Sequence, residues 1–169
     1  GGCPNNCVKP NLNDLGIIGQ RIPEPDLSKC RGCKVCQIEK VCPIHVATLK
    51  DGKLSIDPNT CTHCGRCVNK CPFGAVSEST YGYKIYIGGR WGKRVAEGRP
   101  LSKIFTSEAE VLEIVEKAIL FFRDEGISGE RFADTINRLG FDYVEDKLLN
   151  GKLDKEAVMQ KTVIGGASC

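Results

Sequence analysis

The sequence lacks the features of a membrane protein and of a nucleic-acid-binding protein. Its longest apolar stretch, Val111 to Phe122, is interrupted by charged residues and is shorter than the roughly 18 residues of a membrane span. The formal net charge is only +3, and the basic residues are mixed with acidic ones. Because a nucleic-acid surface needs clustered positive charge, we expect neither nucleic acid nor membrane insertion.

We also expect neither a secretory signal nor a disulfide-rich framework. No stretch before the cysteine runs reads as a signal peptide, and disulfide frameworks are typical of smaller secreted domains. Cysteine is nearly absent from residues 81–169, where the only one is Cys169. We expect Cys169 to be a free thiol on a loose tail, and the other ten to lie in a reducing, cytoplasmic environment.

What is present is a pair of cysteine runs with the same design. Each run has three cysteines separated by two residues, followed by a fourth that precedes proline. The runs are Cys30, Cys33, Cys36 and Cys42, then Cys61, Cys64, Cys67 and Cys71. This spacing predicts two [4Fe–4S] clusters, because a C-x2-C-x2-C loop gives three thiolates to one cube.

The fourth ligand of each cluster is expected to come from the other run, as in two-cluster ferredoxins. The proline after each distal cysteine fixes φ and turns the chain away from the cluster. The expected ligands of cluster 1 are Cys30, Cys33, Cys36 and Cys71, and those of cluster 2 are Cys61, Cys64, Cys67 and Cys42.

A zinc site is the main alternative for these cysteines. Zinc usually takes four ligands from two doublets around one tetrahedral ion, and would leave thiols of these runs unused. His45 and His63 lie beside the runs and could bind metal, but four thiolates already complete each cube. We therefore expect both histidines at the surface or beside the ligands.

The chain divides by composition into an opening piece, residues 1–23, a ferredoxin-like module, residues 24–80, and a cysteine-poor segment. Within the module, residues 47–49 and 53–56 flank Asp51-Gly52, a pair favoured in hairpin turns. The two runs form an internal repeat, for which we expect pseudo-twofold symmetry.

The cysteine-poor segment predicts one strand and three helices over residues 81–150, followed by a tail, residues 151–169. The strand is residues 81–87. One helix begins at the capping box Ser107-x-x-Glu110, buries a face that includes Ile119, and ends at Gly126. A second lies between Ser128 and Gly140, and a third is capped by Asp142. This is an α+β pattern, but its missing strands must come from elsewhere.

Cys3 and Cys7 form a Cys-x3-Cys loop that is a weak motif by itself. Together with residues 11–19 and residues 87–93, it resembles sirohaem-containing sulfite and nitrite reductases, and most closely a subunit of the anaerobic, dissimilatory-type sulfite reductases. The resemblance covers nearly the whole chain. It implies a ferredoxin-like 2[4Fe–4S] module inserted into a partial sirohaem-reductase α+β domain.

The resemblance also implies the cofactors and the reaction. Cys3 would bind a third [4Fe–4S] cluster, and Cys7 would bridge that cluster to sirohaem. Sulfite would be reduced to sulfide with six electrons, which pass from an electron-donor protein or other reductase subunits through the two ferredoxin clusters. Because the upstream cysteine pair of the family is absent, we expect a C-terminal fragment that is inactive alone.

Two further interpretations stay open. A stand-alone electron carrier would use only the two ferredoxin clusters, although it would not need the Cys3/Cys7 loop. The basic residues Lys9, Arg90, Lys93 and Arg94 either pair with sirohaem carboxylates or form a solvated face. For Trp91 the alternatives are a place on an electron path and a packing role, and we expect the packing role.

Overall fold

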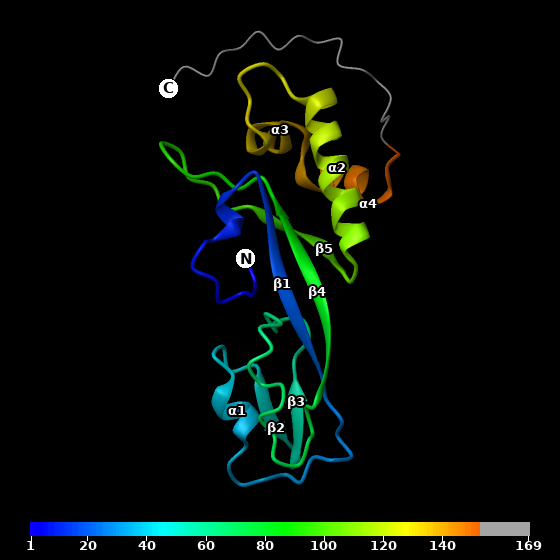
Figure 1. Ribbon diagram of the computed structural model, residues 1–169. Coiled ribbons are helices and arrows are strands. Elements are labelled where there is room, and N and C mark those ends of the chain that lie inside the picture. Colours follow the sequence, from blue (N-terminus) through cyan, green and yellow to red (C-terminus); the bar gives the residue numbers. More distant parts are fainter. Residues whose placement is uncertain (153–169) are drawn as a thin grey trace. The chain divides into compact units, whose positions relative to one another are not determined.

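The computed structural model describes residues 1–152, which form two compact units. The first unit comprises Gly1–Cys7 and Ile18–Gly82, and the second comprises Val8–Ile17 and the described residues from Tyr83 to Lys152. Two long strands, β1 (Leu15–Glu24) and β4 (Glu78–Ile87), contribute residues to both (Figure 1). The boundaries predicted at residues 23 and 80 remain predictions, and Cys169 with nearly all of the predicted tail lies outside the described residues.

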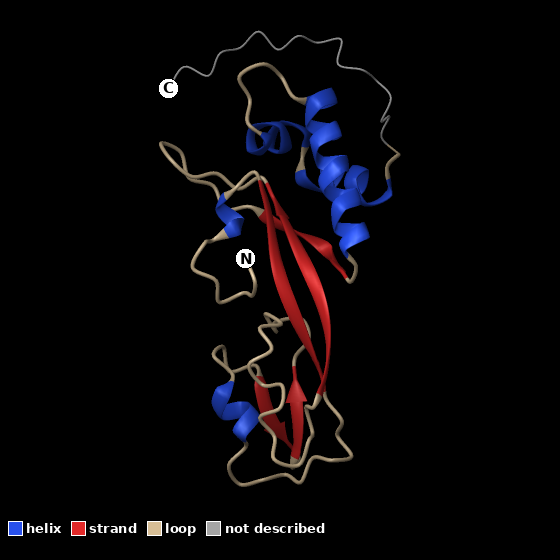
Figure 2. Cartoon of the chain, viewed as in Figure 1, coloured by secondary structure: helices blue, strands red, loops and turns tan. Residues whose placement is uncertain are grey.

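Small sheets together with helices make the chain α+β, as the sequence predicts (Figure 2). One sheet has the order β1-β4-β5, where β5 is Arg99–Phe105. Strand β5 runs antiparallel to β4, from Tyr83 opposite Phe105 to Ile87 opposite Arg99. Of the strands that the predicted segment lacked, β1 comes from outside it, whereas β5 lies inside the segment and was not predicted.

The second unit is built on one apolar core between this sheet and three helices. Its helices are α2 (Glu108–Glu125), α3 (Phe132–Leu139) and α4 (Phe141–Asn150). The buried core residues are Ile85, Ile87, Leu101, Phe105, Val111, Ile114, Ala118, Phe121, Phe132, Ile136, Val144 and Leu148.

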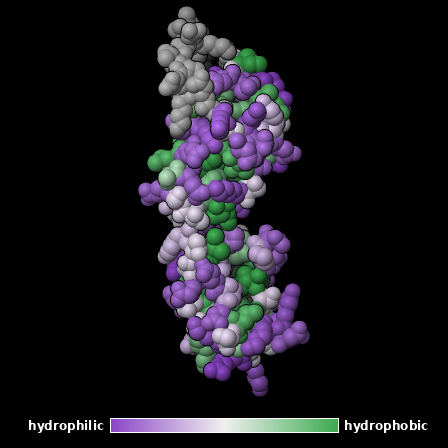
Figure 3. All heavy atoms as spheres, turned by 90° about the vertical axis from the view of Figure 1, so that its right-hand side faces the viewer, coloured by the Kyte–Doolittle hydropathy of each residue, from purple (hydrophilic) through white to green (hydrophobic). Residues whose placement is uncertain are grey.

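Helix α2 begins and ends where the sequence predicts. The Ser107 hydroxyl accepts a hydrogen bond from the Glu110 backbone N–H, and Gly126 is the C-cap. The predicted inward face is wrong at Ile119, which is 63% exposed, because the buried stripe runs through Ile114 and Phe121 instead. Figure 3 shows hydrophobic side chains scattered among hydrophilic ones on the face in view.

Helices α3 and α4 start at different residues from those predicted. Arg131 is the N-cap of α3, three residues after Ser128, and its backbone N–H donates to the Asp134 carboxylate at 3.1 Å. Gly140 ends α3 and is also the N-cap of α4, with φ 91°, so Asp142 lies inside the first turn instead of capping it. No helix among residues 1–152 is long and apolar enough to cross a membrane.

The first unit contains a small hairpin and one short helix. Strands β2 (Ala47–Lys50) and β3 (Lys53–Ile56) pair antiparallel around Asp51-Gly52, which confirms the predicted hairpin. Helix α1 (Gln37–Val41) follows Cys36. The buried core consists of Ile38, Ala47, Leu54, Val68 and Val76, and five of the run cysteines pack against it. This core is small, and half-buried cysteines form part of its surroundings.

Candidate metal centre

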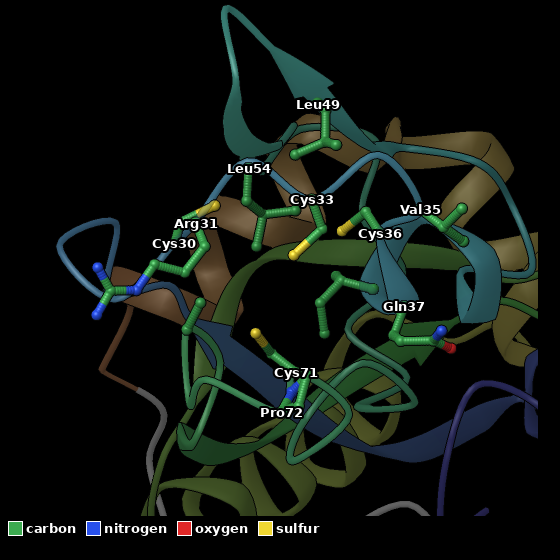
Figure 4. Close-up of a pocket in the computed structure, with 12 residues that line it drawn as sticks. Cys30, Arg31, Cys33, Val35, Cys36, Gln37, Leu49, Leu54, Cys71 and Pro72 are labelled. Atoms are coloured by element: carbon green, nitrogen blue, oxygen red, sulfur yellow. The ribbon is translucent and has the colours of Figure 1, made fainter.

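The first cysteine cavity has a volume of about 130 Å³ and is lined by Cys30, Cys33, Cys36 and Cys71. Helix α1 and strand β3 complete its wall with Ile38 and Leu54. Figure 4 shows the sulfurs of Cys33, Cys36 and Cys71 directed toward the space between them. Since a cavity of roughly 10–15 Å³ on this measure holds one water, this one has room for a group of several atoms.

The second cysteine cavity is narrower, with a volume of about 20 Å³. Its thiols belong to Cys42, Cys61, Cys64 and Cys67, and Pro23 of β1 forms part of the wall. Because a four-iron cube is larger than one water, these side chains must move apart to admit a cluster.

Each cavity combines three cysteines of one run with the Cys-Pro cysteine of the other. The structure thus brings together the two sets of four thiols that the spacing predicts, while their role as cluster ligands stays a prediction. Among residues 1–152, no group of three or more His, Cys, Asp or Glu side chains is arranged to hold a single metal ion. The ten cysteines of this range are all free thiols.

Backbone N–H groups surround the Cys42 sulfur. Burial raises the pKa of the Cys42 thiol, but N–H groups of Ala47, Ile44, Val46 and His45 outweigh this effect, so the pKa lies below its usual value of 9.0. The loop after Cys42-Pro43 therefore stabilises a thiolate at this position.

Burial has the opposite result at two cysteines of the second run. It raises the pKa of Cys67 to about 11, and it also raises the pKa of Cys61, where the His63 N–H acts in the opposite direction. That N–H lies 3.4 Å from the Cys61 Sγ. A bound metal would be needed to keep these thiols ionised at neutral pH.

The two histidines differ in environment. His45 is exposed, whereas His63 is half-buried and its Nδ1 is fully enclosed. His63 contacts sulfur through its backbone N–H. Neither imidazole lines the two cysteine cavities.

Cys3 and Cys7 lie apart from both cavities. Cys3 is half-buried and Cys7 is exposed, and the Asn6 side-chain amide donates to the Cys3 carbonyl at 2.9 Å. The backbone of this segment is attached to β1, where the Gly19 N–H donates to the Gly1 carbonyl at 2.8 Å.

Two expectations for the basic loop after β4 are changed by the structure. Trp91 is 68% exposed, so the predicted packing role is wrong. Arg90 is half-buried and forms an ion pair with Asp134 at 3.1 Å, so its charge is already matched. Lys9, Lys93 and Arg94 are exposed, as a solvated basic face requires.

Strand β1 contributes two residues that the sequence analysis missed. Pro23 lines the second cavity, and Arg21 forms a parallel bridge with Cys64. The only signal in the sequence was the mixed polar and apolar character of residues 15–24, which Gly16, Gly19 and Pro23 obscure.

Comparison with known proteins places the chain in a family. Residues 1–156 match the nitrite and sulphite reductase 4Fe-4S domain. The chain is 32% identical to a coenzyme F420-dependent sulfite reductase of Methanocaldococcus jannaschii, over 83% of this chain and 22% of that protein. It is 28% identical to a subunit of the anaerobic sulfite reductase of Salmonella typhimurium, over 96% of this chain and 50% of that protein.

The fold has a solved counterpart. A crystal structure of dissimilatory sulfite reductase I aligns with a TM-score of 0.59 and 24% identity, covering 95% of this chain and 43% of that chain. The chain thus spans at most half the length of these relatives. With its free thiols, its two cysteine cavities and this match over most of its length, the chain belongs to the nitrite and sulphite reductase 4Fe-4S domain family.

Proposed function

We propose that the chain is the electron-transfer part, and a portion of the catalytic region, of a sirohaem-dependent sulfite reductase that converts sulfite to sulfide with six electrons. The observation that carries this proposal is the pair of cavities, each lined by four cysteines drawn from both runs. The similarity to a subunit of the Salmonella anaerobic sulfite reductase, over 96% of the chain, supports it.

The donor set of each cavity fits a [4Fe–4S] cluster, because four thiolates are the ligands such a cluster requires. Cys30, Cys33, Cys36 and Cys71 would hold one, and Cys42, Cys61, Cys64 and Cys67 the other. When bound, these clusters supply one-electron transfer. The chain's own contribution is to orient the thiolates and to donate backbone N–H groups to sulfur, which helps to set the cluster potentials.

Cys3 and Cys7 are proposed to contribute to a third cluster beside sirohaem, with Cys7 as the bridging ligand. The exposed position of Cys7 supports this role, because its sulfur is accessible to a neighbouring group. Other parts of such a reductase would supply the remaining ligands and the sirohaem pocket. An electron-donor protein or other reductase subunits are the expected partners.

Metal analysis and spectroscopy of the complete reductase test the proposal. Anaerobically prepared reductase should contain about thirteen irons for each copy of this chain, eight in the two cavities, four in the third cluster and one in sirohaem, and should show sirohaem absorption. Added sulfite should oxidise a reduced dye in its presence, with nitrite tested in parallel. Two intact clusters without sirohaem would eliminate the reductase, and one or two zincs in place of iron would eliminate the clusters.

A stand-alone electron carrier is the second candidate. It is favoured by the compactness of the first unit, which contains both cysteine cavities. A carrier would exchange electrons with a dye but would bind no sirohaem and reduce no sulfite. The spectrum therefore separates the two candidates.

A further inference from the structure

One edge of β1 holds both the Cys3/Cys7 segment and the loop of the second cysteine run. The Gly19 N–H donates to the Gly1 carbonyl, and the Arg21 N–H donates to the His63 carbonyl, both at 2.8 Å. Residues two apart in a strand direct their N–H groups to the same edge, and here they are separated by about 7 Å. The opposite edge of β1 pairs with β4.

The first cysteine cavity has no such connection. None of its lining residues comes from β1 or from the Cys3/Cys7 segment, whereas Pro23 of β1 lines the second cavity. By these contacts the second cavity is the one joined to the Cys3/Cys7 segment.

The Arg21 side chain lies directly on the loop of the second run. A Cβ on Gly65 would come within 2.7 Å of the Arg21 Cβ and Cδ, so the loop fits only because residue 65 is glycine. The Arg21 Nε donates to the Ser79 hydroxyl at 3.0 Å, and its guanidinium lies 5.4 Å from the centre of the Tyr81 ring. These contacts hold a cation against the segment that carries Cys64 and Cys67.

The charge of Arg21 has no carboxylate partner among residues 1–152. The first run also has nearby cations, Arg31, Lys34 and Lys53, and Lys53 donates to the Cys30 carbonyl at 2.9 Å. All three are exposed, while Arg21 is half-buried. Because water and salt screen exposed charges more strongly, Arg21 should have the larger effect on its cluster.

We propose that Arg21 is a positioning residue for the second cluster, and that its charge makes this cluster the easier one to reduce and hence the exit toward Cys3 and Cys7. This inference rests on the proposed function. A positive charge favours the more negative, reduced cluster. In the transfer, the first cluster loses one electron and the second gains it, and no proton or atom moves.

A redox titration of the whole chain under anaerobic conditions tests this inference, with electron paramagnetic resonance as the readout of cluster reduction. Arg21→Met removes the charge but keeps an apolar stem over Gly65. It should lower the midpoint potential of the more easily reduced cluster by about 59 mV, which is a tenfold smaller equilibrium constant for its one-electron reduction. Arg21→Lys keeps the charge and should change this midpoint potential little. Arg66→Gln, which removes an exposed cation lining the same cavity, is the matched control.

Each outcome is decisive. An unchanged midpoint potential of the more easily reduced cluster in Arg21→Met, or an equal shift in Arg66→Gln, would overturn the inference. Loss of iron in both Arg21 variants would also overturn it, because the residue would then serve only the fold. Loss of iron in Arg21→Met alone would support a role of the charge. Fewer than two clusters in the unaltered chain would instead defeat the proposed function.

Discussion

His63 and Gly32 occupy equivalent positions in the two cysteine runs, and both have a left-handed backbone, with φ of 53° and 63°. The same holds after the Cys-Pro pairs, where His45 has φ 55° and Gly74 has φ 73°. The runs therefore repeat in backbone conformation even where their residue types differ. Histidine enters this region more readily than most residues other than glycine, so the conformation explains both histidines without a metal.

The first prediction concerns this conformation at His63. His63→Gly should keep both clusters, whereas His63→Val should lower the free energy of unfolding by about 1–2 kcal/mol, because a β-branched side chain is poorly tolerated in the left-handed region. Anaerobic urea titration followed by cluster absorption measures the difference. The neighbouring substitution Thr62→Val is the control and should cost little. Equal stability of the Gly and Val variants would contradict the argument.

The crossed ligand sets give the second prediction. Cys71→Ser should impair the same cluster as Cys30→Ser, because both thiols line the first cavity. Adding Cys71→Ser to Cys30→Ser should therefore remove little further iron. Adding it to Cys61→Ser should impair both clusters, leaving the chain nearly free of iron. Iron analysis of the purified variants decides, and the reverse pattern would show that each run serves its own cluster.

The third prediction is that iron removal unfolds one unit and spares the other. The first unit has a core of five buried residues with cysteines packed around it, whereas the second has a core of twelve. So small a core gives little stability without bound metal. After anaerobic chelation, amide hydrogen exchange should become fast in β2 and β3 and stay slow in α2. Protection of both units would show that the clusters are not needed for folding.

The sequence predicts the elements with strong local signals and misses those without them. The Asp51-Gly52 turn and the Ser107 cap are short-range signals, and both are found where expected. Strand β1 contains Gly16, Gly19 and Pro23, and β5 contains Pro100, residues that are rare inside strands. Pairing with β4 overrides these preferences, and such pairing between distant segments cannot be deduced from local pattern.

The same distinction applies to the candidate site. The two sets of four cysteines follow from spacing, and the structure gathers them around two cavities. The role of Arg21 does not follow from spacing, because it depends on contacts with residues 42 to 60 positions away, at His63, Ser79 and Tyr81. The exposure of Trp91 was missed for a related reason: the sequence does not show whether a large apolar side chain in a loop faces the interior or the solvent.

The last prediction concerns acid stability of the second unit. The Glu130 carboxylate accepts hydrogen bonds from the Arg138 guanidinium at 2.9 Å and from the Thr135 hydroxyl at 2.8 Å. The bond to Arg138, with that to Thr135, lowers the pKa of Glu130 from 4.5 to about 2. A carboxyl with a lowered folded-state pKa stabilises the fold fully above its unfolded pKa, and this contribution is lost as the pH falls from about 4.5 toward 2.

Glu130→Gln should therefore reduce the melting temperature at pH 7 and flatten its dependence on pH between 5 and 2, as measured by the helical circular dichroism of the full chain. Iron is first removed, because acid also releases clusters, and helices α2 to α4 supply the signal. Glu125→Gln, at the end of α2, removes a carboxylate with no such pair of bonds and should keep the slope of the unaltered chain. Were the Glu130→Gln slope to match that control, the Arg138 and Thr135 contacts would contribute nothing to acid sensitivity.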